Sequence, residues 1–220
     1  PLDAALRYAE IGWPVFPCGP DKKPLIRKDD GGSGFHDATT DVAQIVAWWR
    51  KWPKAQVGIA TGAAGLCVID LDMKPSEQKD GVAAFSRLRD ENGPHGCGLV
   101  ASTPRGGRHY VYLMPDPPVS CAADIIKGSG IDVRAEGGYV VAPCGIEGRE
   151  WIEGDPFDVG VDGSSNLCPM PSWVLDLVRG GRRSAAGEAA GIDTDGALPL
   201  RPEQAAAIRR ALSYVDNDPR

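Results

Sequence analysis

The sequence lacks the patterns that mark several large protein classes. No apolar run approaches the roughly 18 residues that a membrane-spanning helix needs, and no basic segment followed by an apolar core opens the chain. The patterns GxxxxGK[ST], HExxH and GxSxG are absent as well. These absences predict a protein with no membrane partner and no secretory signal, and they exclude a P-loop ATPase within this segment.

Closely spaced cysteines are also missing. The six cysteines stand at positions 18, 67, 97, 121, 144 and 168, so the chain has no CxxC pair. This spacing predicts neither a zinc site nor a redox motif. Most of the cysteines lie in apolar runs, as Cys67 does in GLCVID, and we therefore expect buried free thiols in a reducing cytosol.

Excess positive charge is the third absence. The chain carries 24 Lys+Arg against 30 Asp+Glu, a net charge of −6, and residues 147–162 contribute one basic and six acidic side chains to it. Such a balance argues against binding nucleic acid through a global basic field. It leaves open a local site whose own acids are offset by metal ions.

What is present predicts an α+β fold. The 42% hydrophobic and 25% charged residues are ordinary for a globular domain, and 28 Gly with 19 Pro favour many turns. Helices are expected over 2–11, 41–51, 81–92 and 172–179, with Asp41 as an N-cap. Strands are expected over 13–18, 57–62, 65–72, 98–104, 108–114, 130–135 and 138–143.

Short glycine-rich turns connect the last six of these strands in pairs, and they predict three hairpins. We expect one catalytic domain over residues 1–179 and a flexible linker over 180–200. Residues 201–220 are expected to begin a helical module that is truncated here.

The run VIDLD (68–72) places two carboxylates on one strand. Residues two apart share a face, so Asp70 and Asp72 project together, about 6.5–7 Å apart at Cα. Like charges this close destabilise the fold unless a cation lies between them, and Mg²⁺ or Mn²⁺ prefers such oxygen ligands. The alternative is a pair of solvated acids at a strand end.

A third carboxylate, Asp132, lies at the apolar start of another strand in GIDVRAEGG. It fits either a third metal ligand, with Arg134 free for a phosphate or template, or a pair between Asp132 and Arg134 within the strand. The turn in STPRGGRHYVY (102–112) adds Gly107, Arg108 and His109, whose backbone and charge suit an anion. The alternative for His109 is a core histidine.

In this order, VIDLD, STPRGGRHYVY and GIDVRAEGGYVVAP resemble the bifunctional DNA primase/polymerase (prim-pol) family of the archaeo-eukaryotic primase superfamily. ALRYAEIGWPVFPC, KKPL and VGIATG extend the similarity over residues 2–145. The resemblance implies a catalytic sheet like that of an RNA-recognition motif, packed with an additional αβ unit. It also implies the N-terminal catalytic domain of a phage or plasmid primase–helicase.

For the active site, the resemblance implies that Asp70, Asp72 and Asp132 bind two Mg²⁺ or Mn²⁺ ions. It further implies that His109 contacts the phosphates of the incoming nucleotide. These four residues would carry template-directed nucleotidyl transfer.

Other residues fall inside the same motifs with less defined roles. Gly107, Arg108 and Arg134 are candidates for binding the nucleotide phosphates. Lys23, in the KKPL element, is a candidate for touching nucleotide or template, and the alternative is an exposed loop lysine.

The implied partners are a single-stranded DNA template, dNTP or NTP, and a helicase domain in the same polypeptide. The implied setting is the cytoplasm of a bacterial host cell, during phage or mobile-element replication, and no zinc stem is expected. Two alternatives remain: a non-catalytic RNA-recognition-like nucleic-acid-binding module, and a metal-dependent phosphodiesterase using the same acids.

Overall fold

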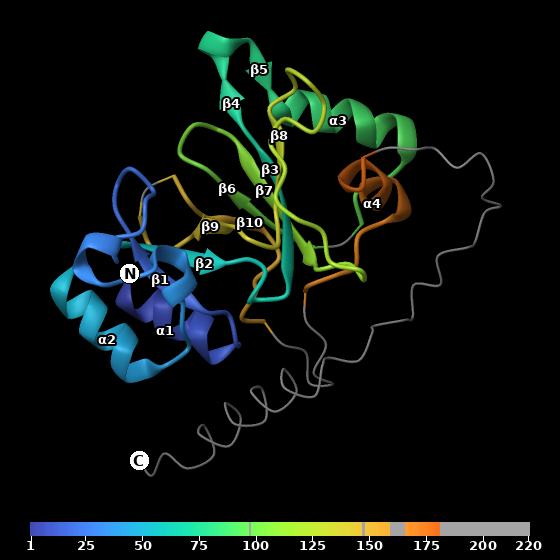
Figure 1. Cartoon of the computed structure of the whole chain (residues 1–220). Coiled ribbons are helices and arrows are strands. Elements are labelled where there is room, and N and C mark those ends of the chain that lie inside the picture. The colour runs from blue at the N-terminus through green and yellow to red at the C-terminus, as the bar shows by residue number, and fades with distance from the viewer. Residues whose placement is uncertain (97, 147, 159–165, 181–220) are drawn as a thin grey trace.

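The computed structural model describes residues 1–96, 98–146, 148–158 and 166–180. It shows a mixed α and β protein whose strands form antiparallel sheets (Figure 1). This agrees with the α+β prediction. The predicted linker beyond residue 180 and the predicted helical module over 201–220 lie outside the described residues.

The predicted helices are confirmed. They are α1 (Leu2–Glu10), α2 (Val42–Lys51), α3 (Gly81–Asn92) and α4 (Ser172–Val178). Asp41 caps α2 as expected, since its Oδ1 accepts the Gln44 N–H at 2.7 Å. The long loop between the first strand and α2 contains two short 3₁₀ helices, η1 (Lys28–Asp30) and η2 (Gly34–Asp37).

The strands form two sheets and a short hairpin. The smaller sheet has the order β1-β2-β9, with β1 (Val15–Cys18), β2 (Gln56–Ala60) and β9 (Tyr139–Ala142). The larger has the order β10-β6-β7-β3-β8, with β10 (Trp151–Glu153), β6 (Leu99–Ser102), β7 (Arg108–Leu113), β3 (Leu66–Leu71) and β8 (Ile131–Arg134). The hairpin comprises β4 (Met73–Lys74), the 3₁₀ turn η3 (Pro75–Glu77) and β5 (Lys79–Asp80).

Of the three predicted hairpins, only β6–β7 is confirmed. β2 pairs with β1 and β9, while β3 pairs with β7 and β8, so the turn after β2 leads from one sheet to the other. The turn after β8 leads back in the same way. At this double crossing, the Thr61 hydroxyl donates to the Ala135 carbonyl at 2.6 Å, and the Thr61 N–H donates to the Gly138 carbonyl at 3.1 Å.

The two wrong hairpins have a physical cause. All five residues of β2 are buried, as are five of the six in β3, so these strands lie between layers rather than at a half-solvated surface. A short glycine turn has the same local sequence whether its two strands pair or separate into packed sheets.

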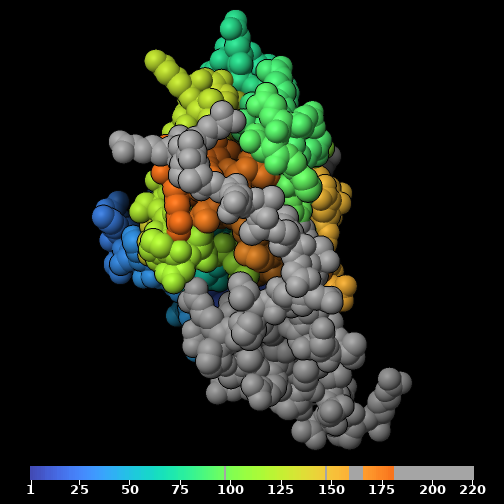
Figure 2. Space-filling view, turned by 90° about the vertical axis from the view of Figure 1, so that its right-hand side faces the viewer, coloured from blue at the N-terminus to red at the C-terminus, as the bar shows by residue number. Residues whose placement is uncertain are grey.

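The larger sheet has a core on each face. Leu66 and Val68 of β3 face the core formed with α1, α2 and the smaller sheet. Ile69 and Leu71 alternate to the opposite face, which is covered by α3 and α4. Figure 2 shows α3 and α4 side by side on this second face.

The cysteines only partly follow expectation. Cys18, Cys67, Cys121 and Cys144 are free, and all but Cys121 are buried. Cys168, however, is disulfide-bonded, so the prediction of a free thiol is wrong at this position. Pairing depends on distance in the fold, which sequence spacing does not show. No helix among the described residues is long and apolar enough to cross a membrane.

Candidate functional site

Three predicted site residues lie in one row across the larger sheet. Asp70, on the central strand β3, stands directly opposite His109 on β7 and directly opposite Asp132 on β8. Directly opposed residues of antiparallel strands share a face, with Cβ atoms about 4.5–5.5 Å apart. Residues far apart in the sequence are thus brought together by strand register.

The row continues the face of the first core. His109 alternates with Tyr110 and lies on the same side of β7 as Val111, which packs in that core. The face is therefore apolar along most of the strands and becomes polar only toward one end. The Asp70 and Asp132 side chains remain only 15% and 12% exposed there, so their charges need partners.

Asp70 has two cationic or potentially cationic neighbours. Its Oδ1 lies 3.4 Å from His109 Nε2, and its Oδ2 accepts from Arg134 Nε at 3.4 Å. Burial alone would raise the pKa of Asp70, but the charges and hydrogen bonds of His109 and Arg134 outweigh burial and lower this pKa to about 2. Asp70 is therefore ionised at neutral pH.

Asp132 is held through both oxygens. Its Oδ2 accepts from Arg134 Nη2 at 2.6 Å, and its Oδ1 accepts from the Asp124 backbone N–H at 2.7 Å. The pair within the strand considered from the sequence therefore exists. Because the same guanidinium also reaches Asp70, Arg134 bridges the two carboxylates.

Asp72 lies just beyond the end of β3, where its Oδ2 pairs with Lys74 Nζ at 2.7 Å. The backbone of Asp72 is fixed from both sides: its N–H donates to the Gly130 carbonyl, and its own carbonyl accepts from the Gly81 N–H. A Cβ at Gly81 would stand 2.5 Å from the Gly130 oxygen, so only glycine allows this approach. The start of α3 thus positions Asp72.

One functional candidate, Arg149, was missed in the sequence. It is only 3% exposed, its Nη1 donates to the Val141 carbonyl at 3.0 Å, and its buried Nε has no partner among the described residues. Burial lowers the pKa of Arg149, while the charge of Asp70 acts in the opposite direction, which places the two groups within electrostatic range. A buried guanidinium with an unused donor is suited to an anionic ligand.

A second candidate missed in the sequence is Lys22. The sequence had pointed instead to Lys23, the next residue of KKPL. The backbone of Lys22 has a positive φ of 67°. Burial, Arg149 and Arg105 lower the pKa of Lys22, and Asp70 and Asp72 raise it, so Lys22 lies in the field of the acids. The sequence signals were weak: one lysine of a pair, and the single base within an acidic stretch.

Lys23 points elsewhere. Its side chain is 79% exposed, pairs with Asp21 at 3.8 Å, and lines a hollow of ≈ 480 Å³ together with Arg27 and Lys28. A role in binding nucleotide or template remains a prediction for Lys23.

The structure separates Arg108 from His109. Arg108 pairs with Leu71 and Ser102, and strand alternation places it on the opposite face from His109. Packing requires glycine at position 107, because any Cβ there would collide with the Leu71 carbonyl oxygen. Their phosphate-binding roles remain predictions.

The donor types of Asp70, Asp72 and Asp132 fit a hard divalent cation, since all three supply carboxylate oxygens. Their arrangement is less complete: among the described residues, no three His, Cys, Asp or Glu side chains converge closely enough to hold a metal ion. Instead, Arg134 and Lys74 bind the carboxylate oxygens.

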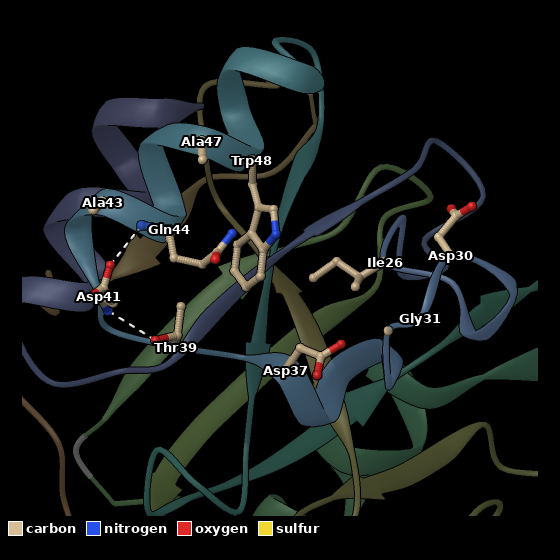
Figure 3. A pocket seen from close by; sticks show the side chains of 11 residues that line it. Ile26, Asp30, Gly31, Asp37, Thr39, Asp41, Ala43, Gln44, Ala47 and Trp48 are labelled. Atoms are coloured by element: carbon tan, nitrogen blue, oxygen red, sulfur yellow. Dashed lines mark hydrogen bonds between the residues drawn. The ribbon is translucent and has the colours of Figure 1, made fainter.

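A larger hollow of ≈ 790 Å³ lies between α2 and the loop before it, and contains none of these residues (Figure 3). Two of its three acids serve local structure: Asp41 caps α2, and the Asp37 Oδ2 accepts the Ser33 N–H. The carboxylate row is therefore the better candidate site.

The fold and site define a mixed α and β protein with a largely buried row of acids that contacts His109 and Arg134. The model of the family described as bifunctional DNA primase/polymerase, N-terminal, matches residues 5–173, and the chain belongs to this family. A search of curated proteins finds no match to the chain. Membership implies a nucleotidyltransferase-type enzyme that acts on DNA and nucleotides, in a family that generally uses divalent metals.

Proposed function

We propose that this chain catalyses template-directed nucleotidyl transfer, making and extending primers on single-stranded DNA as a DNA primase and polymerase. The observation that carries the proposal is the row of His109, Asp70 and Asp132 across three adjacent strands. The family match supports it independently of side-chain geometry.

The acidic residues and His109 would have different roles. Asp70, Asp72 and Asp132 would hold two Mg²⁺ or Mn²⁺ ions, and these ions would supply activation of the attacking 3′-hydroxyl and charge neutralisation at the leaving pyrophosphate. Because Asp70 is ionised at neutral pH, it is ready to bind a cation without losing a proton. His109 would contact the phosphates of the incoming nucleotide, an electrostatic role rather than proton abstraction.

We assign Arg149 and Lys22 to the same triphosphate. Arg149 is buried and has an unused Nε donor, so a phosphate oxygen would satisfy a group that the protein leaves unpaired. Burial and the repulsive field of Arg149 and Arg105 lower the pKa of Lys22, and a phosphate bound nearby would offset that repulsion.

The sheet order supports the finer fold assignment. In chain order, β3, β6, β7 and β8 are the first to fourth strands, and α3 lies between the first two. Their order in space is β6-β7-β3-β8, which is second, third, first, fourth. We propose that these strands form the RNA-recognition-like catalytic sheet of an archaeo-eukaryotic primase, and that β1, β2, β9, α1 and α2 form the additional αβ unit. A helicase in the same polypeptide and a phage or mobile-element setting belong to the same proposal.

The non-catalytic alternative is disfavoured by the aromatic side chains of β7. RNA-recognition-like binding modules expose aromatics on their central strands so that bases stack on them. Here Tyr110 and Tyr112 are 4% and 1% exposed and pack against α3 and α4. The solvent-accessible part of the opposite face carries acids instead.

One incubation separates the three functions: the protein with Mn²⁺, labelled nucleotides, and a single-stranded template with and without a primer. We expect elongated primers, or new dinucleotides where no primer is supplied. Shortened template would support the phosphodiesterase, and template binding without turnover would support the binding module; either result would contradict the proposal.

A further inference from the structure

The carboxylates assigned to metal ions are each already paired with a cation of the same chain. Arg134 contacts Asp132 at 2.6 Å through Nη2 and Asp70 at 3.4 Å through Nε. Lys74 contacts Asp72 at 2.7 Å. Two cationic side chains of the protein therefore pair with all three carboxylates.

Both cations occupy equivalent positions in the sequence. Arg134 follows Asp132 by two residues on β8, and Lys74 follows Asp72 by two residues onto β4. In extended chain this spacing returns the side chain to the same face, so the contact is built into the local geometry.

The β4–β5 hairpin that carries Lys74 is fastened to the rest of the site. Lys79 on β5 lies 3.5 Å from the Asp124 carboxylate, and the Asp124 N–H donates to Asp132 Oδ1 at 2.7 Å. Figure 1 shows the hairpin beside the loop that precedes β8. Lys74 is thus held at the site rather than swinging freely in solvent, and its side chain is only 31% exposed.

A divalent ion and these cations seek the same oxygens. Because Arg134 and Lys74 are paired to Asp70, Asp72 and Asp132, an incoming ion meets carboxylates whose charge is already partly offset. At the Oδ2 atoms of all three carboxylates, the ion competes with the ammonium or the guanidinium. This explains why the acids supply suitable ligands and yet do not converge among the described residues.

We propose that Lys74 and Arg134 are internal counter-cations that compete with divalent metal for Asp72, Asp70 and Asp132. Metal binding to the free protein is then weak, and it strengthens when a triphosphate offers both cations another anionic partner. The inference rests on the proposed function. Lys74 and Arg134 act in it as positioning residues, through the carboxylates.

The test measures metal binding directly, without turnover. Mn²⁺ is titrated into the full chain without nucleotide, and free Mn²⁺ is followed by its electron paramagnetic resonance signal. Lys74→Met should bind Mn²⁺ roughly tenfold more tightly than the wild type, because Asp72 then has no competing cation. That change corresponds to about 1.4 kcal/mol.

Matched variants separate competition from general charge. Lys54→Met removes an exposed lysine that lies outside the β4–β5 hairpin and outside the carboxylate row, and it should leave the Mn²⁺ affinity unchanged. Lys74→Arg keeps the charge and should also leave it unchanged. Arg134→Met is the second variant and should tighten binding in the same direction as Lys74→Met.

The melting temperature is a second readout that does not depend on measuring free Mn²⁺. Lys74→Met should melt lower than the wild type in EDTA, where Asp72 is uncompensated, and Mn²⁺ should restore it. A non-hydrolysable dNTP analogue should tighten Mn²⁺ binding more in the wild type than in Lys74→Met.

The possible failures are distinguishable. Equal or weaker Mn²⁺ binding by Lys74→Met and Arg134→Met, beside a wild type that binds metal with the analogue, would overturn this inference and leave the proposed function standing. No Mn²⁺ binding by any of these proteins, with or without the analogue, would overturn both.

Discussion

Buried charge at the carboxylate row explains most of what individual residues do in this protein. Asp70 is 15% exposed at its side chain, yet its pKa falls to about 2 because His109 and Arg134 outweigh the cost of burial. A carboxyl group whose pKa is lower when folded than the unfolded value of about 3.9 stabilises the fold above that value. The stabilisation is lost as pH falls toward 2.

This sign gives a prediction for Asp70→Asn. At pH 7 the variant should lose roughly 2 kcal/mol of unfolding free energy, since the carboxylate partner of His109 and Arg134 is gone. The difference from the wild type should shrink between about pH 4 and pH 2. Urea unfolding at a series of pH values measures it, and a difference that stays constant down to pH 2 would contradict the assigned ionisation.

Arg149 provides the opposite case, a buried charge with an unused donor. Arg149→Met should change the urea midpoint little, because removing an unpaired buried charge offsets the lost hydrogen bond to Val141. The KM for nucleotide should rise roughly tenfold or more, as expected for a lost charged contact.

The control for Arg149→Met is Arg149→Lys, which keeps the charge without the guanidinium geometry and should bind nucleotide with intermediate affinity. If Arg149→Met unfolded the protein while Arg149→Lys bound nucleotide like the wild type, the Arg149 side chain would have a structural role and no geometric one at the phosphate.

Local residue patterns indicated the acids as candidate site residues but did not indicate Arg149. Asp70 and His109 were recognisable because their motifs are local, and strand alternation fixed which neighbours share their face. Arg149 was not recognisable as a candidate, because its burial arises only from packing of the fold and the field of Asp70 comes from a segment distant in the sequence.

Among the elements, the start of α3 has the clearest link to the site. Gly81 opens this helix and approaches both Asp72 and the Gly130 carbonyl, where a Cβ would stand 2.5 Å from the oxygen. Alanine normally favours a helix over glycine by about 1 kcal/mol. At Gly81 the steric conflict should outweigh this preference, so that alanine destabilises the protein.

We therefore expect Gly81→Ala to lower the unfolding free energy by about 1–3 kcal/mol and to displace Asp72. Ser86→Ala, in the same helix, is the control and should be close to neutral. Chemical denaturation of both variants measures the effect. An increase in stability for Gly81→Ala would show that the backbone of Asp72 is not constrained as described.

Helices and strands were largely predictable as elements, since each carries its own caps, periodicity and glycine turns. Strand partners were not. The turn at Thr61–Gly65 and the turn after β8 each connect two sheets, and a short glycine turn in the sequence does not distinguish such a crossing from a hairpin. Only packing of the two sheets over a shared core decides it.

At the scale of the whole molecule, the net charge of −6 does not describe the site. The acidic stretch that dominates it includes β10, which forms one edge of the larger sheet, whereas Asp132 lies on β8 at the other edge. Between these edges, the row pairs its acids with His109 and Arg134. Arg149 and Lys22 lie in the electrostatic field of Asp70. Binding of DNA by this chain would then depend on a local, metal-loaded site.

That account is tested most directly by extension of a labelled primer on a single-stranded template with Mn²⁺, comparing Asp70→Asn with the wild type. Asp90→Asn is the matched control, since the Asp90 side chain is 71% exposed on α3, outside the row. Circular dichroism at the assay temperature confirms that each variant is folded. The account predicts that Asp70→Asn loses roughly 100-fold or more in extension rate, while Asp90→Asn extends like the wild type. Extension by folded Asp70→Asn at the wild-type rate would contradict it.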